Sequence, residues 1–183
     1  MHLFAFISFW GVVLGVGTAY GWQGSVAACG FTLLIAALFV FQRNRKLAGW
    51  AIWFAFALSF PLPAVAIMSG GSTAIIGWEA ALTVFRAVVV FPFMIDDDFL
   101  FGMWLSSLAV VNTILLFTPL LLTTNRYRKL LAGLLCGGTI VAWLVVFLLP
   151  PALIGFYLWA ASITTFSILK LVDLKRKREP HAT

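Results

Sequence analysis

Apolar residues follow one another along this chain in long runs, and short polar or basic phrases separate the runs. A run of about 18 or more uncharged, apolar residues is typical of a transmembrane helix, because at about 1.5 Å per residue it crosses most of a hydrocarbon core roughly 30 Å thick. The pattern predicts an all-α membrane protein, a single bundle of six spans followed by a basic tail at residues 173–183. The predicted spans are residues 3–20, 25–41, 47–68, 99–123, 130–149 and 152–172.

Two similar basic phrases, RNRKLAG beginning at Arg43 and RYRKLLAG beginning at Arg126, each join two predicted spans. Lys and Arg concentrate in the cytoplasmic loops of membrane proteins. Six spans place both phrases and the tail on the cytoplasmic side if both termini lie there too. The repeated phrase has two interpretations: a duplicated helical hairpin, or the general preference of tight cytoplasmic turns for basic residues. The bases expected at lipid headgroups are Arg43, Arg45, Lys46, Arg126, Arg128, Lys129, Lys175, Arg176, Lys177 and Arg178.

Residues 73–95 are long enough to form a further span, but their charges argue against it. A seventh span would move the second basic phrase and the tail to the outer side, and it would place Glu79 and Arg86 in hydrocarbon. Insertion scales give about 2.5–3.5 kcal/mol for a charged residue at the centre of a span. We therefore expect an extra helix on the outer side, lying at the interface or re-entering the membrane.

Glu79, Thr83 and Arg86 follow four-then-three spacing, so they form one narrow polar stripe on this outer helix. The stripe can face away from the apolar phase or press into the bundle. Three aspartates precede the fourth span, where acids are favourable at the positive end of a helix dipole and could also meet a basic partner. The candidate partner-binding residues on the outer face are Trp78, Glu79, Thr83, Arg86, Asp96, Asp97 and Asp98.

Composition agrees with a membrane protein, since 63% of the 183 residues are apolar and 10% are charged. A soluble domain is about 25% charged. The net charge is +6, and nearly all bases lie in the two phrases and in the tail, with which Lys170 is grouped. Clusters at helix ends indicate membrane topology and not nucleic-acid binding. Cys29 and Cys136 are expected at different depths, so we interpret them as packing residues and not as a disulfide.

Residues that could carry chemistry are scarce in the predicted spans. Ionisable residues within a membrane usually mark a functional site, but the interiors of the six spans contain none. His2 and His181 lie near opposite ends of the chain, and no metal-binding or phosphate-binding motif occurs. The sequence therefore argues against a proton relay and a metal-dependent hydrolase. We expect no cofactor, no metal ion and no enzymatic activity.

Small and mildly polar residues in the spans indicate contacts between helices. Gly11 with Gly15, and Gly133 with Gly137, form GxxxG pairs that let another helix approach closely, either within the bundle or from a different protein. Asn112, near the middle of the fourth span, is expected to form an interhelical hydrogen bond, and the alternative is a contact to a substrate. Prolines at 61, 63 and 119 are expected to kink the third and fourth spans. Trp and Tyr residues are expected in belts at the two boundaries, with Tyr20, Trp22, Trp78, Trp104, Tyr157 and Trp159 near the outer one and Trp50 and Tyr127 near the inner one.

Three functions fit these patterns. The first is a non-catalytic membrane protein that binds another integral membrane protein, as a small subunit of a complex or as an inhibitor of the immunity or exclusion type. The partner could also be a second copy of the same chain, in a homo-oligomer. The second is a small transporter or channel for a neutral or lipid-like solute. The third is a membrane enzyme with an outer-face site, but one glutamate and one arginine are few candidates for catalytic groups. Short loops and the absence of an N-x-S/T sequon favour a bacterial inner membrane.

Overall fold

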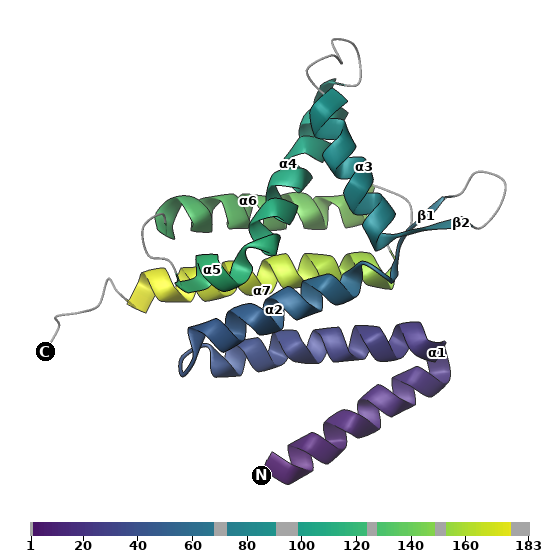
Figure 1. The fold of residues 1–183 in the computed structure, drawn as a ribbon, viewed down its shortest axis with the longest axis vertical. Helices are drawn as coiled ribbons and strands as arrows, with labels where there is room; N and C mark the ends of the chain where they lie inside the picture. Colours follow the sequence, from purple (N-terminus) through teal and green to yellow (C-terminus); the bar gives the residue numbers. More distant parts are fainter. Residues whose placement is uncertain (1, 68–72, 91–98, 124–127, 149–152, 177–183) are drawn as a thin grey trace, which may run out of the picture.

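The structure is a computed structural model in which residues 2–67, 73–90, 99–123, 128–148 and 153–176 are described (Figure 1). Within these ranges, side chains are described for residues 21–64, 74–86, 88–89, 106–123, 129–144 and 153–175. The described chain is mostly helical, with seven helices and one two-stranded antiparallel sheet. The all-α prediction is thus correct for the helices and wrong for the short sheet.

Helix α1 runs from His2 to Val40 and contains one sharp break, at Gly21. Gly21 has φ 67° and ψ −161°, a backbone conformation that is essentially restricted to glycine. Two helices therefore join through one residue, where the sequence had predicted two spans with a short loop at 21–24. In Figure 1 the N-terminal half of α1 leaves the other helices at this point.

Replacing Gly21 with alanine should destabilise the protein, because a Cβ atom is strained at this φ and ψ. The expected loss is about 1–3 kcal/mol in the free energy of unfolding, measured by far-UV circular dichroism of the detergent-purified chain during heating. Gly137→Ala is the control, since Gly137 lies in a regular, exposed helix with open space around it. A Gly21→Ala variant as stable as that control would show that the break does not depend on glycine.

Helix α2 covers Arg45–Ser59, and the side chain of Asn44 caps its start by accepting a hydrogen bond from the Leu47 amide. The prediction of a span over residues 47–68 is wrong at its C-terminal end. The chain leaves the helix after Ser59 because Pro61 and Pro63 cannot donate the hydrogen bonds that a helix requires. It then forms strand β1, Pro63–Ile67, which pairs with strand β2, Thr73–Ile76.

Strand β2 leads directly into helix α3, Gly77–Val90. The predicted outer segment at 73–95 is therefore a strand followed by a helix, and residues 91–95 lie outside the described chain. Helix α4, Phe99–Leu116, is interrupted at Phe117, and the short helix α5, Thr118–Thr123, continues with Pro119 in its first turn. The expected kink of the fourth span is thus present. Helices α6, Arg128–Leu148, and α7, Ile154–Arg176, complete the fold.

Helix α7 lies at the centre of the helical group and packs against α1, α2 and α6 (Figure 1). It runs antiparallel to α2, since Arg45 pairs with Asp173 at one end and the Leu153 amide donates to Ala64 O at the other. It also runs antiparallel to α6, because Thr139 bonds Ser167 at 2.9 Å and the Trp143 indole donates to Thr164 at 3.0 Å. Helices α3 and α4 pack on each other and project away from this group.

Two of the described helical segments are long and apolar enough to cross a membrane, Gly21–Val40 and Ile154–Lys175. The apolar parts of α4 and α6, Ser106–Leu116 and Lys129–Leu144, are shorter. Much of Ile154–Lys175 is buried within the fold, whereas most of Gly21–Val40 is not. The full set of six spans stays a prediction.

Candidate functional site

The outer-face residues of α3 turn away from the packed side of that helix. Val84 is buried and Ala80 and Ala81 line a cavity, whereas Thr83 and Arg86 are exposed. The Thr83 hydroxyl donates to the Glu79 carbonyl of its own helix at 2.9 Å. The polar stripe therefore faces outward at Thr83 and Arg86, and Glu79 at its start is half-buried. Trp78 is also exposed, and the predicted residues Asp96, Asp97 and Asp98 lie outside the described chain.

Glycines of the packed helices bring neighbouring elements into close contact. A Cβ atom on Gly30 of α1 would lie 2.6 Å from Leu158 of α7, and one on Gly138 of α6 would overlap Val111 of α4. Near the sheet, a Cβ on Gly155 would lie 2.9 Å from Leu62 O. None of these glycines was singled out from the sequence, because their spacing does not form a GxxxG pair.

Gly133 and Gly137 behave differently from these packed glycines. Both are exposed on α6, and a Cβ atom at either position would meet nothing within 4 Å among the described residues. The internal helix contact that the sequence favoured for this pair is therefore not made in the described chain. The reason is geometric, since Gly138 and not Gly137 turns toward α4. Gly11 and Gly15 lie in the half of α1 whose side-chain surroundings are not described.

Asn112 links α4 to α7 inside the fold. Its Oδ1 accepts a hydrogen bond of 2.6 Å from the indole Nε1 of Trp159, and both side chains are buried. Beside this pair lies a cavity of about 70 Å³ that is partly open to the surface and is bordered by α2, α3, α4, α7 and β1. The residues that line it are Ser59, Phe60, Ala64, Gly77, Ala80, Ala81, Val84, Leu108, Asn112, Gly155, Phe156 and Trp159.

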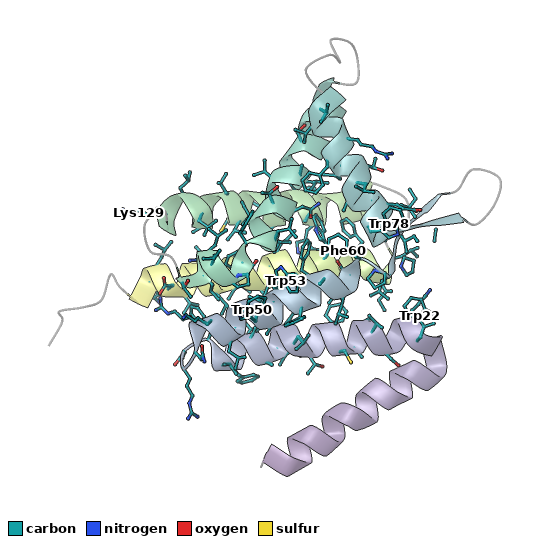
Figure 2. All side chains as sticks on the ribbon, in the orientation of Figure 1. Trp22, Trp50, Trp53, Phe60, Trp78 and Lys129 are labelled. Carbon is teal, nitrogen blue, oxygen red and sulfur yellow. The ribbon has the colours of Figure 1, made fainter. Side chains whose placement is uncertain are left out.

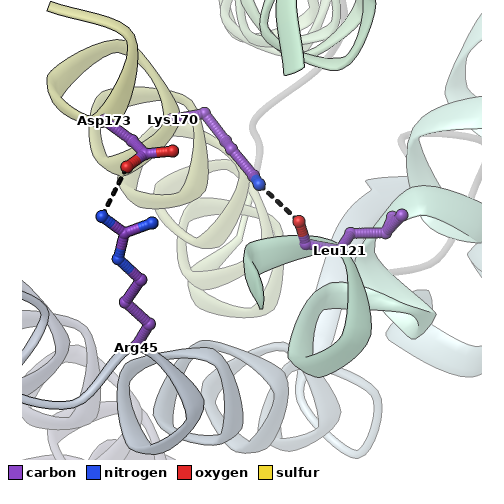
Figure 3. Close-up of polar contacts among 4 residues, drawn as sticks. All are labelled: Arg45, Leu121, Lys170 and Asp173. Carbon is purple, nitrogen blue, oxygen red and sulfur yellow. Dashed lines mark hydrogen bonds and ion pairs between the residues drawn. The ribbon is translucent and has the colours of Figure 1, made fainter. Parts of the chain in front are cut away.

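A charged cluster lies where α2 begins and α7 ends (Figure 3). Arg45 Nη2 lies 2.7 Å from a carboxylate oxygen of Asp173, which is only 2% exposed. One turn earlier on α7, the ammonium of the buried Lys170 donates to the backbone carbonyl of Leu121. Leu121 lies in the last turn of α5, where helix carbonyls lack intrahelical donors and the helix dipole is negative, so a lysine is a favourable cap.

Sequence reasoning missed this cluster. Lys170 was grouped with the solvated tail, Arg45 was assigned to lipid headgroups, and Asp173 was given no role. One signal was available: Lys170 and Asp173 are three residues apart and share a helical face with Ile163 and Phe166, which are fully buried. The partner of that face, the Leu121 carbonyl, could not be found from the sequence because it depends on how α5 folds against α7.

Apart from Arg86 on α3, the remaining described bases lie at the same end of the helical group as this cluster. Arg43, Lys46, Lys129 and Lys175 are exposed there, and Figure 2 places Lys129 at the end opposite Trp22 and Trp78. We call this end the basic end, and the opposite one the hairpin end because it carries β1 and β2. The side chains of Arg126, Arg128, Arg176, Lys177 and Arg178 are not among those described.

Both cysteines, Cys29 and Cys136, are free thiols. Among the described residues, no group of three or more His, Cys, Asp and Glu side chains could hold a metal ion. No protein-family model, curated protein or solved structure matches the chain. Any functional conclusion must therefore come from the residues themselves.

Proposed function

We propose that this chain is a non-catalytic protein of a bacterial inner membrane that crosses the bilayer six times, has both termini in the cytoplasm, and acts by binding another integral membrane protein. The membrane setting is supported by apolar side chains that stay uncovered on the helices. Phe39, Leu120 and Leu130 are 81%, 66% and 63% exposed. Such surfaces are unfavourable in water and are typical of contact with lipid or with another protein.

The distribution of charge supports the orientation. Apart from Arg86 on α3, the described bases gather at the basic end, which we assign to the cytoplasm, while exposed Trp22 and Trp78 lie at the hairpin end. Two hydrogen bonds pair backbone groups next to the two strands. Besides the pairing of β1 with β2, the Gly77 amide donates to Leu62 O and the Leu153 amide donates to Ala64 O, both at 2.9 Å.

The observation that carries the proposed partner binding is the open space over Gly133 and Gly137. Other helical glycines, such as Gly30 and Gly138, are filled by a neighbouring helix of this chain, but these two are not. Leu130 and Leu134 on the same helix are exposed as well. We infer that a transmembrane helix of the partner packs into this notch, since closely approaching helices gain van der Waals contact and need no hydrophobic driving force in lipid.

Isoleucine at both positions, Gly133→Ile with Gly137→Ile, should release the partner. The tagged full chain would be purified in mild detergent from its native membrane, and co-purifying proteins would be quantified by mass spectrometry. We expect a stoichiometric integral membrane partner with the wild type and at least tenfold less with the variant. The bulky side chains should not unfold the chain, because they enter open space.

Val110→Phe is the matched control, since it adds bulk at an exposed position of a different helix, α4, where Val110 is 50% exposed. It should retain the partner in full. A wild-type chain that purifies alone or only with copies of itself at every detergent strength would contradict the proposal. Equal partner yield from the wild type and the double isoleucine variant would show that the notch is not the contact.

A further inference from the structure

The cavity beside Asn112 is uncharged and mostly apolar. Three aromatic side chains, Phe60, Phe156 and Trp159, form part of its wall, and Val84 and Leu108 add aliphatic surface. None of the described lining residues is charged. A concave apolar site with a few placed polar groups is the usual form of a small-molecule site. A charged ligand would lose its hydration here without compensation, so the occupant that fits this wall is neutral.

Asn112 is the polar group that distinguishes this cavity from a packing defect. An indole nitrogen can only donate, so the atom of Asn112 that faces Trp159 must be the carbonyl oxygen. The orientation of the amide is therefore fixed, and the other branch of the side chain is the NH₂ group with two donors. Among the described residues, this NH₂ group makes no hydrogen bond; Asn112 as a whole is 95% buried, but its Nδ2 atom is not fully enclosed and borders the cavity.

Ser59 carries the one hydroxyl among the described residues of the cavity wall, and it makes no hydrogen bond with Asn112. Ser59 Oγ donates to the carbonyl of Phe56 at 2.6 Å, one turn back in its own helix. Buried amide donors are almost always paired in folded proteins. The unmatched donors of Asn112 therefore point to an acceptor that the chain itself does not supply.

We propose that this cavity binds a neutral, lipid-soluble carbonyl compound. Its carbonyl oxygen accepts from the NH₂ group of Asn112, and its apolar body lies against Phe60, Phe156 and Trp159. Two sources share this chemistry: a free ring compound of the quinone class and the ester carbonyl of a bilayer lipid. The aromatic wall suits a flat ring, because aromatic groups stack in offset or edge-on arrangements. The site is separate from the glycine notch on α6 and does not depend on the proposed partner.

The test uses the full chain in nanodiscs made from diether phospholipids, which contain no ester carbonyl. Tail-less 2-methyl-1,4-naphthoquinone is titrated in, and saturable binding is followed by quenching of tryptophan fluorescence and by the rise in unfolding temperature. Asn112→Asp keeps an acceptor for Trp159 and removes both amide donors, so the affinity should fall at least tenfold. Ala81→Leu fills the cavity with a side chain and should weaken binding similarly while the protein stays folded.

Thr113→Val is the matched control, because Thr113 is next to Asn112 on α4 but does not line the cavity and bonds only its own helix at Ala109 O. It should bind as the wild type does. Nanodiscs of diester lipids identify the source. If they lower the apparent affinity for the quinone, or raise the unfolding temperature of the wild type but not of Asn112→Asp, bilayer esters occupy the site.

If diester and diether lipids give the same quinone affinity, the natural occupant is a free ring compound. The proposal is overturned if neither the quinone nor the diester lipid has any effect on the wild type. It is also overturned if folded Asn112→Asp and Ala81→Leu variants respond as strongly as Thr113→Val. None of these outcomes bears on whether the double isoleucine variant of α6 loses its partner, so the two proposals fail independently.

Discussion

Replacing Gly77 with alanine is expected to lower the free energy of unfolding by about 3 kcal/mol, the upper part of the range for an overpacked site. Gly77 joins β2 to α3 and lies against the end of α2. A Cβ atom there would overlap the carbonyl oxygen of Ser59 and would lie 3.0 Å from Phe60 Cα. Because these obstacles are backbone atoms, no side-chain rotation relieves them. The join between α2, the sheet and α3 must open instead.

The measurement is thermal unfolding of the purified chain in detergent, followed by circular dichroism and repeated with a denaturant titration. Gly133→Ala, in open space on α6, is the matched control and should be neutral or stabilising. The stability of Gly30→Ala should lie between those of Gly77→Ala and Gly133→Ala, because the atoms that its Cβ would meet belong to the flexible side chain of Leu158. Equal stability of Gly77→Ala and Gly133→Ala would mean that α2 and α3 are not packed as closely as described.

Replacing Asp173 with alanine is expected to cost about 3 kcal/mol of stability. Removing one partner of a buried ion pair typically costs about 3–5 kcal/mol, and the lower end applies because the Arg45 side chain is 34% exposed. Most of this loss comes from the charge that stays behind. The ammonium of Lys170, one turn away on α7, remains fully buried after the carboxylate has been removed. Adding Lys170→Met to Asp173→Ala should therefore restore at least about 1 kcal/mol, although the carbonyl of Leu121 then loses its donor.

A double-mutant cycle of Arg45→Ala and Asp173→Ala measures how strongly the two side chains are coupled, using the same unfolding assay. Arg43→Ala is the control, because Arg43 is an exposed base near the same turn and should change stability by less than about 0.5 kcal/mol. An Asp173→Ala variant as stable as Arg43→Ala, or additive single effects in the cycle, would show that the charged cluster does not hold α2 to α7.

Much of the helical framework could be predicted from hydrophobic runs and breaking residues. The basic turn after Val40, the interruption near Pro119 and a last helix through residue 172 all follow from local composition. The third span failed because an apolar run does not distinguish a helix from a buried strand. Residues 63–67 are apolar enough for a helix or a strand. They form a strand because they hydrogen-bond to Thr73–Ile76, a pairing that the apolar run itself does not reveal.

The sites divide in a similar way. The sequence singled out Asn112 because an amide in an apolar run is unusual, but it placed Trp159 in a belt at the membrane boundary. Trp159 is 9% exposed and its indole donates to Asn112. Its place in the boundary belt stays a prediction, but the sequence did not predict this pairing, because the type of a residue does not tell which side chain it meets. Lys170 was misassigned for a related reason: its charge was counted with neighbouring bases, whereas its position on the helix directs it into the fold.

The central position of α7 has a consequence for how the protein is made. This helix follows the other described helices in the chain and, among the side chains that the structure describes, contributes more buried ones than any of them. During translation, α1, α2 and α6 leave the ribosome with the faces that α7 will cover still open. The ion pair of Arg45 with Asp173 can form only after Asp173, which lies in α7, has been synthesised. A premature stop before Ile154 would therefore leave a set of helices that lacks the part of the core contributed by α7, and such a chain is the form that proteolytic quality control would remove.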